Sequence, residues 1–380
     1  MNMDYRIFIN FSFYLLITLN GFSQDILQSP KVIQDPENYY KYASDSRRFT
    51  GIPSLAIAPQ GRLWTTWYAG RTPGEDQNNY VVVSTSGDNG HTWSEVMVVD
   101  PDGAGPVRAY DPQLWLDPDH RLWFFWTQTI GLNGTVAGVW YMTTDNPDDE
   151  NPEWTAPKRI TDGVMMNKPT VLANGDWVLA VSTWRDTDNS AKVFASSDKG
   201  HHWELRGAVH VPKEDREYDE HMIVEKKDGT LWMLVRTKYG IGESFSHDAG
   251  KTWEKLSPSR FKHTSSRFHM RRLASGNLLF VKNGPLNIKT GRSHLMAFIS
   301  TDDGNSWSNG TLIDERVNVS YPDGQQRADG TIFIVYDFDR YGTQQILVTS
   351  FEEETLTQLP PDEAILAVFK NRHNVSKGGR

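Results

Sequence analysis

An eight-residue pattern, Ser-x-Asp-x-Gly-x-x-Trp, occurs four times in this chain and constrains its fold more than any other feature. The copies, called Asp boxes here, run from Ser86 to Trp93, Ser196 to Trp203, Ser246 to Trp253 and Ser300 to Trp307. Self-similarity at fixed positions indicates an array of similar units. In each copy we expect Asp to turn the chain, Gly to take a positive φ and Trp to pack between units. A fourfold feature does not mark a single site, so the boxes are predicted to be scaffold rather than catalytic or calcium-binding centres.

A second pattern, a polar turn followed by an aromatic or β-branched run, recurs between the Asp boxes. Its six copies lie about 47 to 59 residues apart and start at Gly61, His120, Gly175, Gly229, Gly276 and Gly330. The runs that follow, such as 231–236, have the composition of strands, and no long helical period competes with them. Six such units predict an all-β fold, a six-bladed β-propeller with Asp-box hairpins. The degenerate stretch 143–154 is interpreted as a fifth, damaged box.

The composition of the 380-residue chain is that of a globular protein, with 38% hydrophobic residues and a formal net charge of −9. This charge argues against nucleic acid and anionic membranes as partners, but not against an anionic sugar in a small basic pocket. The chain contains no cysteine, which excludes disulfides, thiolate catalysis and zinc-thiolate sites. No dense cluster of His, Asp and Glu appears in the sequence, so we expect neither a catalytic metal nor another cofactor.

Residues 1–23 have the pattern of a secretory signal peptide. Arg6 precedes an apolar stretch over 7–19, and small residues occupy positions −3 and −1 before Gln24. The stretch is short for a membrane span, and the alternative is a short N-terminal anchor. No later segment reaches 18 consecutive apolar residues. We therefore expect an exported protein, periplasmic or secreted, whose residues 24–380 form a single propeller domain without a membrane span.

The Asp boxes and the six repeats resemble the sialidase (neuraminidase) superfamily over nearly the whole mature chain. In that family three arginines grip the substrate carboxylate, a Tyr activated by a Glu attacks the anomeric carbon, and an Asp is the acid and base. The resemblance implies that Glu220 and Arg236 are the Glu and the second Arg, and that Arg292 is the third Arg. It also implies that Tyr321 is the nucleophile and that Asp76, in the loop before the first Asp box, is the acid and base.

One element departs from the family pattern. The first arginine of sialidases belongs to an Arg-Ile-Pro motif, and this chain reads Gly-Ile-Pro at 51–53. Arg48, three residues upstream, and Arg71, across the blade, are the candidates to replace it. Asp76 follows a second acid, Glu75, so the acid and base position can be displaced by one residue.

Two histidines and a further arginine complete the candidate site. His221 adjoins Glu220, and His269 lies in a basic stretch with Arg267, so we expect the histidines to transfer protons and Arg267 to bind substrate. Each candidate also has a purely structural interpretation. These are an internal ion pair for the Glu and Arg, a packed aromatic ring for the Tyr and an ordinary loop acid for the Asp.

The same groups support two reactions. In hydrolysis, Tyr321 loses its proton toward Glu220 and attacks, while Asp76 protonates the leaving oxygen. In elimination, Arg236 and Arg292 neutralise a uronate carboxylate, and a Tyr or His removes the C5 proton. The absent first arginine and the histidines favour elimination, by a lyase or dehydratase, on the terminal uronate of an acidic oligo- or polysaccharide. Propeller enzymes that act on ulvan are similar in general layout. The alternatives are a sialidase-like exo-hydrolase and a non-catalytic glycan-binding propeller.

Overall fold

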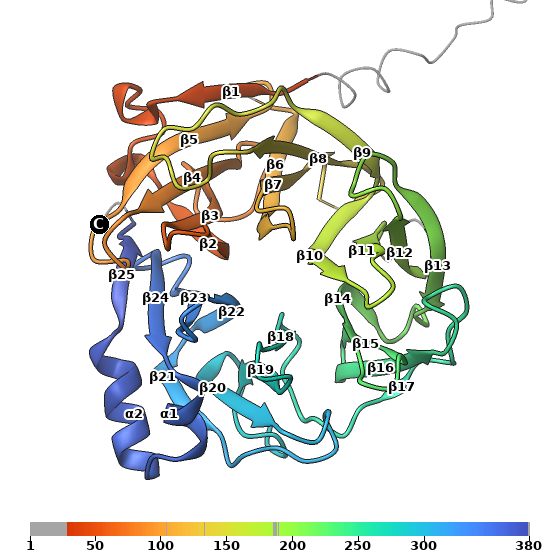
Figure 1. Ribbon diagram of the computed structural model, residues 1–380. Coiled ribbons are helices and arrows are strands. Elements are labelled where there is room, and N and C mark those ends of the chain that lie inside the picture. Colours follow the sequence, from red (N-terminus) through yellow and green to blue (C-terminus); the bar gives the residue numbers. More distant parts are fainter. Residues whose placement is uncertain (1–28, 104, 133, 185–187, 189, 379–380) are drawn as a thin grey trace, which may run out of the picture.

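Six antiparallel sheets surround a central axis as the blades of a propeller (Figure 1). The structure is a computed structural model that describes residues 29–378 except 104, 133, 185–187 and 189. The predicted six-bladed β-propeller is confirmed. The predicted signal peptide lies outside the described residues. Within the described part of the chain, no helix has the length and apolar character needed to cross a membrane.

Each of the first three blades is built from consecutive strands. The first contains β1 (Lys31–Gln34), β2 (Phe49–Ile57), β3 (Leu63–Gly70), β4 (Tyr80–Ser86) and β5 (Ser94–Asp100), in the order β1-β5-β4-β3-β2. The second contains β6 (Val107–Leu116), β7 (Leu122–Ile130), β8 (Val136–Thr144) and β9 (Lys158–Asp162). The third contains β10 (Val164–Val171), β11 (Trp177–Ser182), β12 (Ser190–Ser196) and β13 (Glu204–His210).

The last three blades repeat this arrangement, with the first strand of each nearest the axis (Figure 1). The fourth contains β14 (Arg216–Glu225), β15 (Leu231–Thr237), β16 (Gly240–Ser246) and β17 (Ser257–Pro258). The fifth contains β18 (His269–Arg272), β19 (Leu278–Asn283), β20 (Ser293–Ser300) and β21 (Thr311–Val317). The sixth contains β22 (Val319–Gln326), β23 (Ile332–Phe338), β24 (Gln345–Phe351) and, after helices α1 (Glu353–Thr357) and α2 (Pro361–Lys370), β25 (His373–Ser376).

The core is divided among apolar clusters that lie between neighbouring blades. Trp115 of the second blade and Trp177 of the third, for example, meet edge to face with ring centroids 4.8 Å apart. Leu55 of the first blade and Phe333 of the sixth belong to one cluster, so the ring closes on itself. Each sheet therefore buries both faces, which explains the nearly continuous apolar runs of its central strands.

The Asp boxes are hairpin staples, as predicted. In the third box the Ser246 hydroxyl donates to Asp248 Oδ1 and accepts the Gly250 amide, both at 2.9 Å. The Asp248 carboxylate also accepts the Thr252 amide at 2.9 Å, and Trp253 Nε1 donates to the Gly250 carbonyl at 3.0 Å. Gly250 has a φ of 89°, a conformation that favours glycine. The box closes the turn after the third strand of its blade.

The Asp boxes lie at one end of the propeller, and the loops between the second and third strands lie at the other. In the first blade Ile57 pairs with Leu63, and Leu63 pairs with Ser86, so the box begins where β2 ends. The start of β2 at Phe49 and the loop 71–79 are at the opposite end, which we call the loop end.

The two helices were not predicted from the sequence. They pack against the fifth and sixth blades, where Leu356 of α1 and Val368 of α2 are buried (Figure 1). Helix α2 starts at Pro361, a residue suited to the first helical turn, and ends at Lys370 beside the negative end of the helix dipole. It is too short for its period to stand out in the sequence.

If the Asp box is a hairpin staple, a substitution in it should lower the stability of the protein without changing its ligand binding. Replacing Ser246 by Ala leaves the buried Gly250 amide without its acceptor, so we expect the free energy of unfolding to fall by about 1–3 kcal/mol in urea titrations. Ligand binding at the loop end should not change, because the box lies at the other end of the blade. The control, Ser257→Ala at an exposed position in β17, should stay within about 0.5 kcal/mol of the parent. Equal stability of parent and Ser246→Ala would contradict the staple role.

Candidate active site

A cavity of about 330 Å³ opens at the loop end of the propeller. Its walls come from the inner strands β2, β6, β14 and β22 and from the loops around them. The charged and phenolic groups that line it include Arg108, Arg236, Arg292, Arg340, Glu75, Asp111, Glu220 and Tyr321. Concave sites with a few converging polar groups are the usual places for small ligands.

A larger cavity of about 540 Å³ lies at the opposite end of the inner strands. Three of its lining cations have carboxylate partners, in the pairs Lys168–Asp323 at 2.7 Å, Arg272–Asp303 at 2.6 Å and Arg327–Asp329 at 2.6 Å. The fourth, Arg271, donates to the Thr170 hydroxyl and the Pro169 carbonyl. These neutralised charges have little to offer a charged ligand. The loop-end cavity is therefore the better candidate for the active site.

Four residues of the inner strands that line the loop-end cavity have left-handed backbone conformations. Their φ angles are 61° for Ile52, 44° for Asp111, 41° for Glu220 and 54° for Tyr321. Each lies where its inner strand shifts register against the second strand of the blade. Such bulges redirect side chains, and the left-handed conformation costs roughly 1–3 kcal/mol at a residue other than glycine. The same distortion in four blades points four side chains toward one cavity.

Arg236 joins the two residues predicted to form the nucleophile and its base. Its Nη1 donates to Glu220 Oε2 at 2.9 Å and to Tyr321 Oη at 3.0 Å, and all three side chains are buried. Burial alone would raise the pKa of Glu220, but the guanidiniums of Arg236 and Arg267 outweigh it and hold that pKa below its usual value. Glu220 is therefore ionised beside the phenol.

Three further guanidiniums surround the ring of Tyr321. Their central carbons lie 5.0 Å (Arg340), 5.1 Å (Arg292) and 5.2 Å (Arg267) from the ring centroid, within the range of cation–π contacts. With Arg236 at the hydroxyl, the phenol has positive charge on several sides. This environment suits a group or a ligand that carries negative charge.

The acid at the cavity wall is Glu75, not Asp76. Glu75 is about one third exposed, and its carboxylate oxygens lie 3.8 Å from Arg108 Nη1 and 3.6 Å from Arg340 Nη1. The Asp76 carboxylate is bonded within its own loop, to the Thr72 hydroxyl and, at 2.8 Å, to the Asn78 amide. The sequence allowed the acid and base position to be displaced by one residue. The structure places that displaced residue, Glu75, at the cavity.

Asp111 is a third acid that lines the cavity, beside Glu75 and Glu220, and sequence reasoning missed it. Burial raises its pKa to about 7, although Arg267, whose Nη2 lies 3.8 Å away, acts in the opposite direction. Arg267 itself lies beneath Tyr321 and is buried, and its three nitrogens have no hydrogen-bond partner among the described residues. It contributes charge to the floor of the cavity rather than to its lining.

The arginine absent from position 51 has a replacement that neither sequence candidate supplies. Arg71 is exposed, and neither it nor Arg48 lines the cavity. Arg340, from the loop after β23, lines it instead. A Cβ atom at Gly51 would lie only 2.2 Å from Arg340 Cδ. The side chain of Arg340 thus occupies the space that a side chain at position 51 would need.

The two histidines are not at the cavity. His221 Nε2 contacts the Lys192 carbonyl at 2.7 Å, and His269 Nδ1 lies 3.3 Å from the Asp323 carboxylate below the cavity. Burial lowers the pKa of both histidines. The expected proton-transfer role is therefore not supported by their placement. The bulge turns the Glu220 side chain to the cavity, whereas the His221 ring lies beside β12.

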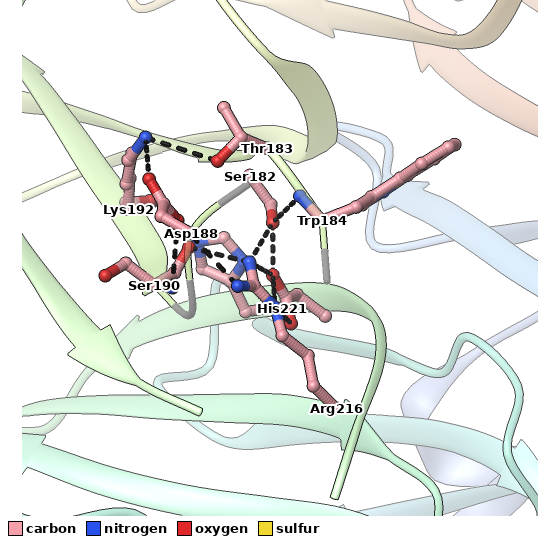
Figure 2. A network of polar contacts seen from close by, with 9 residues as sticks. Ser182, Thr183, Trp184, Asp188, Ser190, Lys192, Arg216 and His221 are labelled. Carbon is pink, nitrogen blue, oxygen red and sulfur yellow. Dashed lines mark hydrogen bonds and ion pairs between the residues drawn. The ribbon is translucent and has the colours of Figure 1, made fainter. Parts of the chain in front are cut away.

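A polar network beside the cavity supports the strand that carries Glu220 (Figure 2). Arg216 Nη2 donates to Asp219 Oδ2 at 2.6 Å and to Ser182 Oγ at 2.9 Å, and Ser182 Oγ accepts the Trp184 amide at 3.1 Å. Figure 2 shows the Trp184 indole extending away from this network. The network thus positions two cavity residues at once, Glu220 through its neighbour Asp219 and Trp184 through its amide.

One side of the cavity is aromatic. The Trp184 ring contacts Tyr110 at 5.7 Å and Tyr218 at 5.4 Å between centroids, and all three residues line the cavity. Aromatic faces of this kind suit the apolar faces or acyl groups of sugars. In the described part of the chain, no three His, Asp or Glu side chains converge in a metal-binding arrangement.

Comparison with solved structures identifies the fold as a sialidase-like six-bladed β-propeller. The Hadza microbial sialidase Hz136 superposes with a TM-score of 0.66 at 18% identity, over 82% of this chain and 67% of that one. The intramolecular trans-sialidase from Ruminococcus gnavus gives 0.67 at 15% identity, over 85% and 98%. A protein of unknown function from Dyadobacter fermentans DSM 18053 gives 0.62 at 17% identity, over 83% and 95%.

The sequence profile of the BNR repeat-like domain matches residues 95–334, which is more than half of the chain. The chain belongs to this family of BNR repeat-like proteins. No curated protein matches the chain. A sialidase-like propeller supports a glycan-active enzyme or a glycan binder in general.

The raised pKa of Asp111 predicts a pH dependence of stability. Because burial raises this pKa from 3.8 to about 7, the folded protein holds a proton that the unfolded chain has lost between these values. The free energy of unfolding then falls as pH rises through this range, by up to about 1.4 kcal/mol per pH unit. Asp111→Asn lacks this contribution, so its stability should fall less between about pH 4 and pH 7 in urea titrations. Asp362→Asn, on the surface of α2, should keep the parent's pH dependence, and the same result for Asp111→Asn would contradict the prediction.

Proposed function

We propose that the protein is an exo-acting glycoside hydrolase that removes a terminal sugar carrying a carboxylate at its anomeric carbon. The observation that carries the proposal is the contact of one Arg236 nitrogen with both Glu220 and the Tyr321 hydroxyl, inside a cavity rich in guanidiniums. A neutral phenol is a suitable nucleophile for such a sugar, because an attacking carboxylate would be repelled by the sugar's own carboxylate.

In the first step the Tyr321 oxygen attacks the anomeric carbon, and its proton passes to Glu220. The bond from the anomeric carbon to the leaving oxygen breaks, and Glu75 gives that oxygen a proton. In the second step water attacks the same carbon and Glu75 takes a proton from that water. The bond from this carbon to the Tyr321 oxygen breaks, and Glu220 returns its proton to that oxygen. Glu75 suits both steps because it is partly exposed at the cavity wall, where the leaving group and water exchange.

The remaining charged groups bind the sugar. Arg236 and Arg292 face the cavity and can donate to the sugar carboxylate. Asp111, whose pKa burial raises to about 7, is largely protonated in mildly acidic solution and can then donate a hydrogen bond to a sugar hydroxyl.

Elimination on a terminal uronate, favoured by the sequence, loses two of its three supporting arguments. The histidines that were to remove the C5 proton lie outside the cavity, and Arg340 stands where an arginine was thought to be absent. Tyr321 could still act as the base in elimination, so product analysis must distinguish elimination from hydrolysis.

We also propose that the protein is exported, to the periplasm or the medium, on the strength of the signal-peptide pattern at 1–23. N-terminal sequencing of protein from the native host tests this, with Gln24 expected as the first residue.

Product analysis tests the reaction type. We expect incubation with acidic oligosaccharides that end in a sialic acid to release the intact acidic monosaccharide, seen by mass spectrometry. During incubation with uronate-terminated oligosaccharides, the absorbance at about 232 nm, which reports an unsaturated uronate, should stay constant. A rise in that absorbance would support elimination instead. No product from either group of oligosaccharides, with binding retained, would support a glycan-binding propeller.

The leaving group identifies the acid. Glu75→Gln should lower kcat/KM by about 10²- to 10⁴-fold for an alkyl glycoside, and by less for a nitrophenyl glycoside whose leaving oxygen needs no proton. Asp76→Asn changes the neighbouring carboxylate without removing the cavity acid, so it should lower the rate less and without this dependence on leaving group. The reverse ranking would restore Asp76 as the acid.

A further inference from the structure

We infer that Arg340 is the residue that sets the preference for a carboxylate ligand, and that Gly51 is required because its missing side chain admits Arg340 to the cavity. The inference rests on the proposed function for the ligand class. It concerns two residues that are about 290 positions apart in the sequence and that meet where the first and sixth blades join.

Arg340 has a donor that the protein does not use. Its side chain is only 10% exposed and lines the cavity. Its Nη1 is buried and has no hydrogen-bond partner among the described residues, since the nearest carboxylate oxygen, on Glu75, is 3.6 Å away. A buried cationic donor of this kind is costly unless an acceptor reaches it. A ligand carboxylate in the cavity would be such an acceptor.

The backbone does not explain the glycine at position 51. Gly51 does not have a left-handed conformation, so any residue could adopt its backbone angles. The reason is steric, because a Cβ there would lie 2.2 Å from Arg340 Cδ and 2.7 Å from Cγ. These atoms are in the middle of the side chain, and their displacement would move the guanidinium.

The Asp337 carboxylate contacts both the strand that contains Gly51 and the side chain of Arg340. Its Oδ2 accepts the Ile52 amide at 2.9 Å, and its Oδ1 accepts the Ser320 hydroxyl at 2.7 Å. The same carboxylate lies 3.8 Å from Arg340 Nε. Thus the residue after Gly51, the residue before Tyr321 and the stem of Arg340 share one buried anchor. Arg340 is thereby placed beside the Tyr321 ring.

A binding experiment with a pair of probes tests the inference. The probes are the 2,3-unsaturated glycal of N-acetylneuraminic acid and its methyl ester, which lacks the charge. Calorimetry compares the parent with Arg340→Ala, Gly51→Ala and the double variant. We expect each single variant to bind the acid about 10- to 100-fold more weakly, the effect of losing one charged hydrogen bond. Affinity for the ester should stay within about twofold of the parent's.

The double variant shows whether Gly51→Ala weakens binding by displacing Arg340 or by a separate effect. If Gly51→Ala acts only by displacing Arg340, then adding it to Arg340→Ala should change affinity by less than about twofold. The control is Gly87→Ala, whose Cβ would meet only the tip of the Arg62 side chain, at 3.2 Å, away from the cavity. It should bind both probes as the parent does.

The outcomes distinguish the inference from the function on which it rests. A parent that binds neither probe contradicts the proposed substrate class, and the inference falls with it. A parent that prefers the acid, together with an Arg340→Ala variant that keeps this preference, overturns the inference alone. Should Gly51→Ala fail to fold, recovery of a cooperative melt in the double variant supports the steric pairing. Failure to recover contradicts it.

Discussion

The joint between the first and sixth blades is the constraint on which the rest of the structure depends. Every sheet is made of strands from one stretch of chain, so no shared strand closes the ring (Figure 1). Contacts between the two blades close it instead, including a bond from the Thr50 amide to the Arg340 carbonyl at 3.3 Å. The buried Asp323 carboxylate accepts the Ser54 hydroxyl at 2.6 Å and the Leu55 amide at 2.8 Å, and Asp337 accepts the Ile52 amide. Because Tyr321 and Arg340 belong to the same joint, closing the ring also assembles the candidate site.

The chemistry of the site follows from an imbalance of charge in a buried space. Four arginines line the cavity, and a fifth lies under Tyr321. The three acids that line the cavity, Glu75, Asp111 and Glu220, do not cancel this charge, since burial raises the pKa of Asp111 to about 7. Glu220 is held ionised by its contact with Arg236. A cavity with surplus positive charge beside a phenol favours an anionic ligand, and the negative net charge of the whole chain does not oppose this at short range.

The fold could be predicted because its signals are local and repeated. An Asp box closes its own turn through bonds between residues two to four apart, such as Ser246 with Gly250, so the pattern is complete within eight residues. Strand composition and regular spacing then indicate the blades. The helices α1 and α2 escaped prediction because they are short, and because contacts with the fifth and sixth blades stabilise them more than their own periodicity does.

The sequence by itself determined the blade architecture, because each repeat carries its own signal. It named Glu220, Arg236, Arg292 and Tyr321 as candidates for the site only through the resemblance to sialidases. Only the tertiary structure decided that Glu75 rather than Asp76 faces the cavity, that both histidines turn away from it, and that Arg340 fills the space beside position 51. The physical reason is distance along the chain. A repeat encodes its own hydrogen bonds, whereas the direction of a side chain and its partner in another blade are set when the ring closes and distant segments pack together.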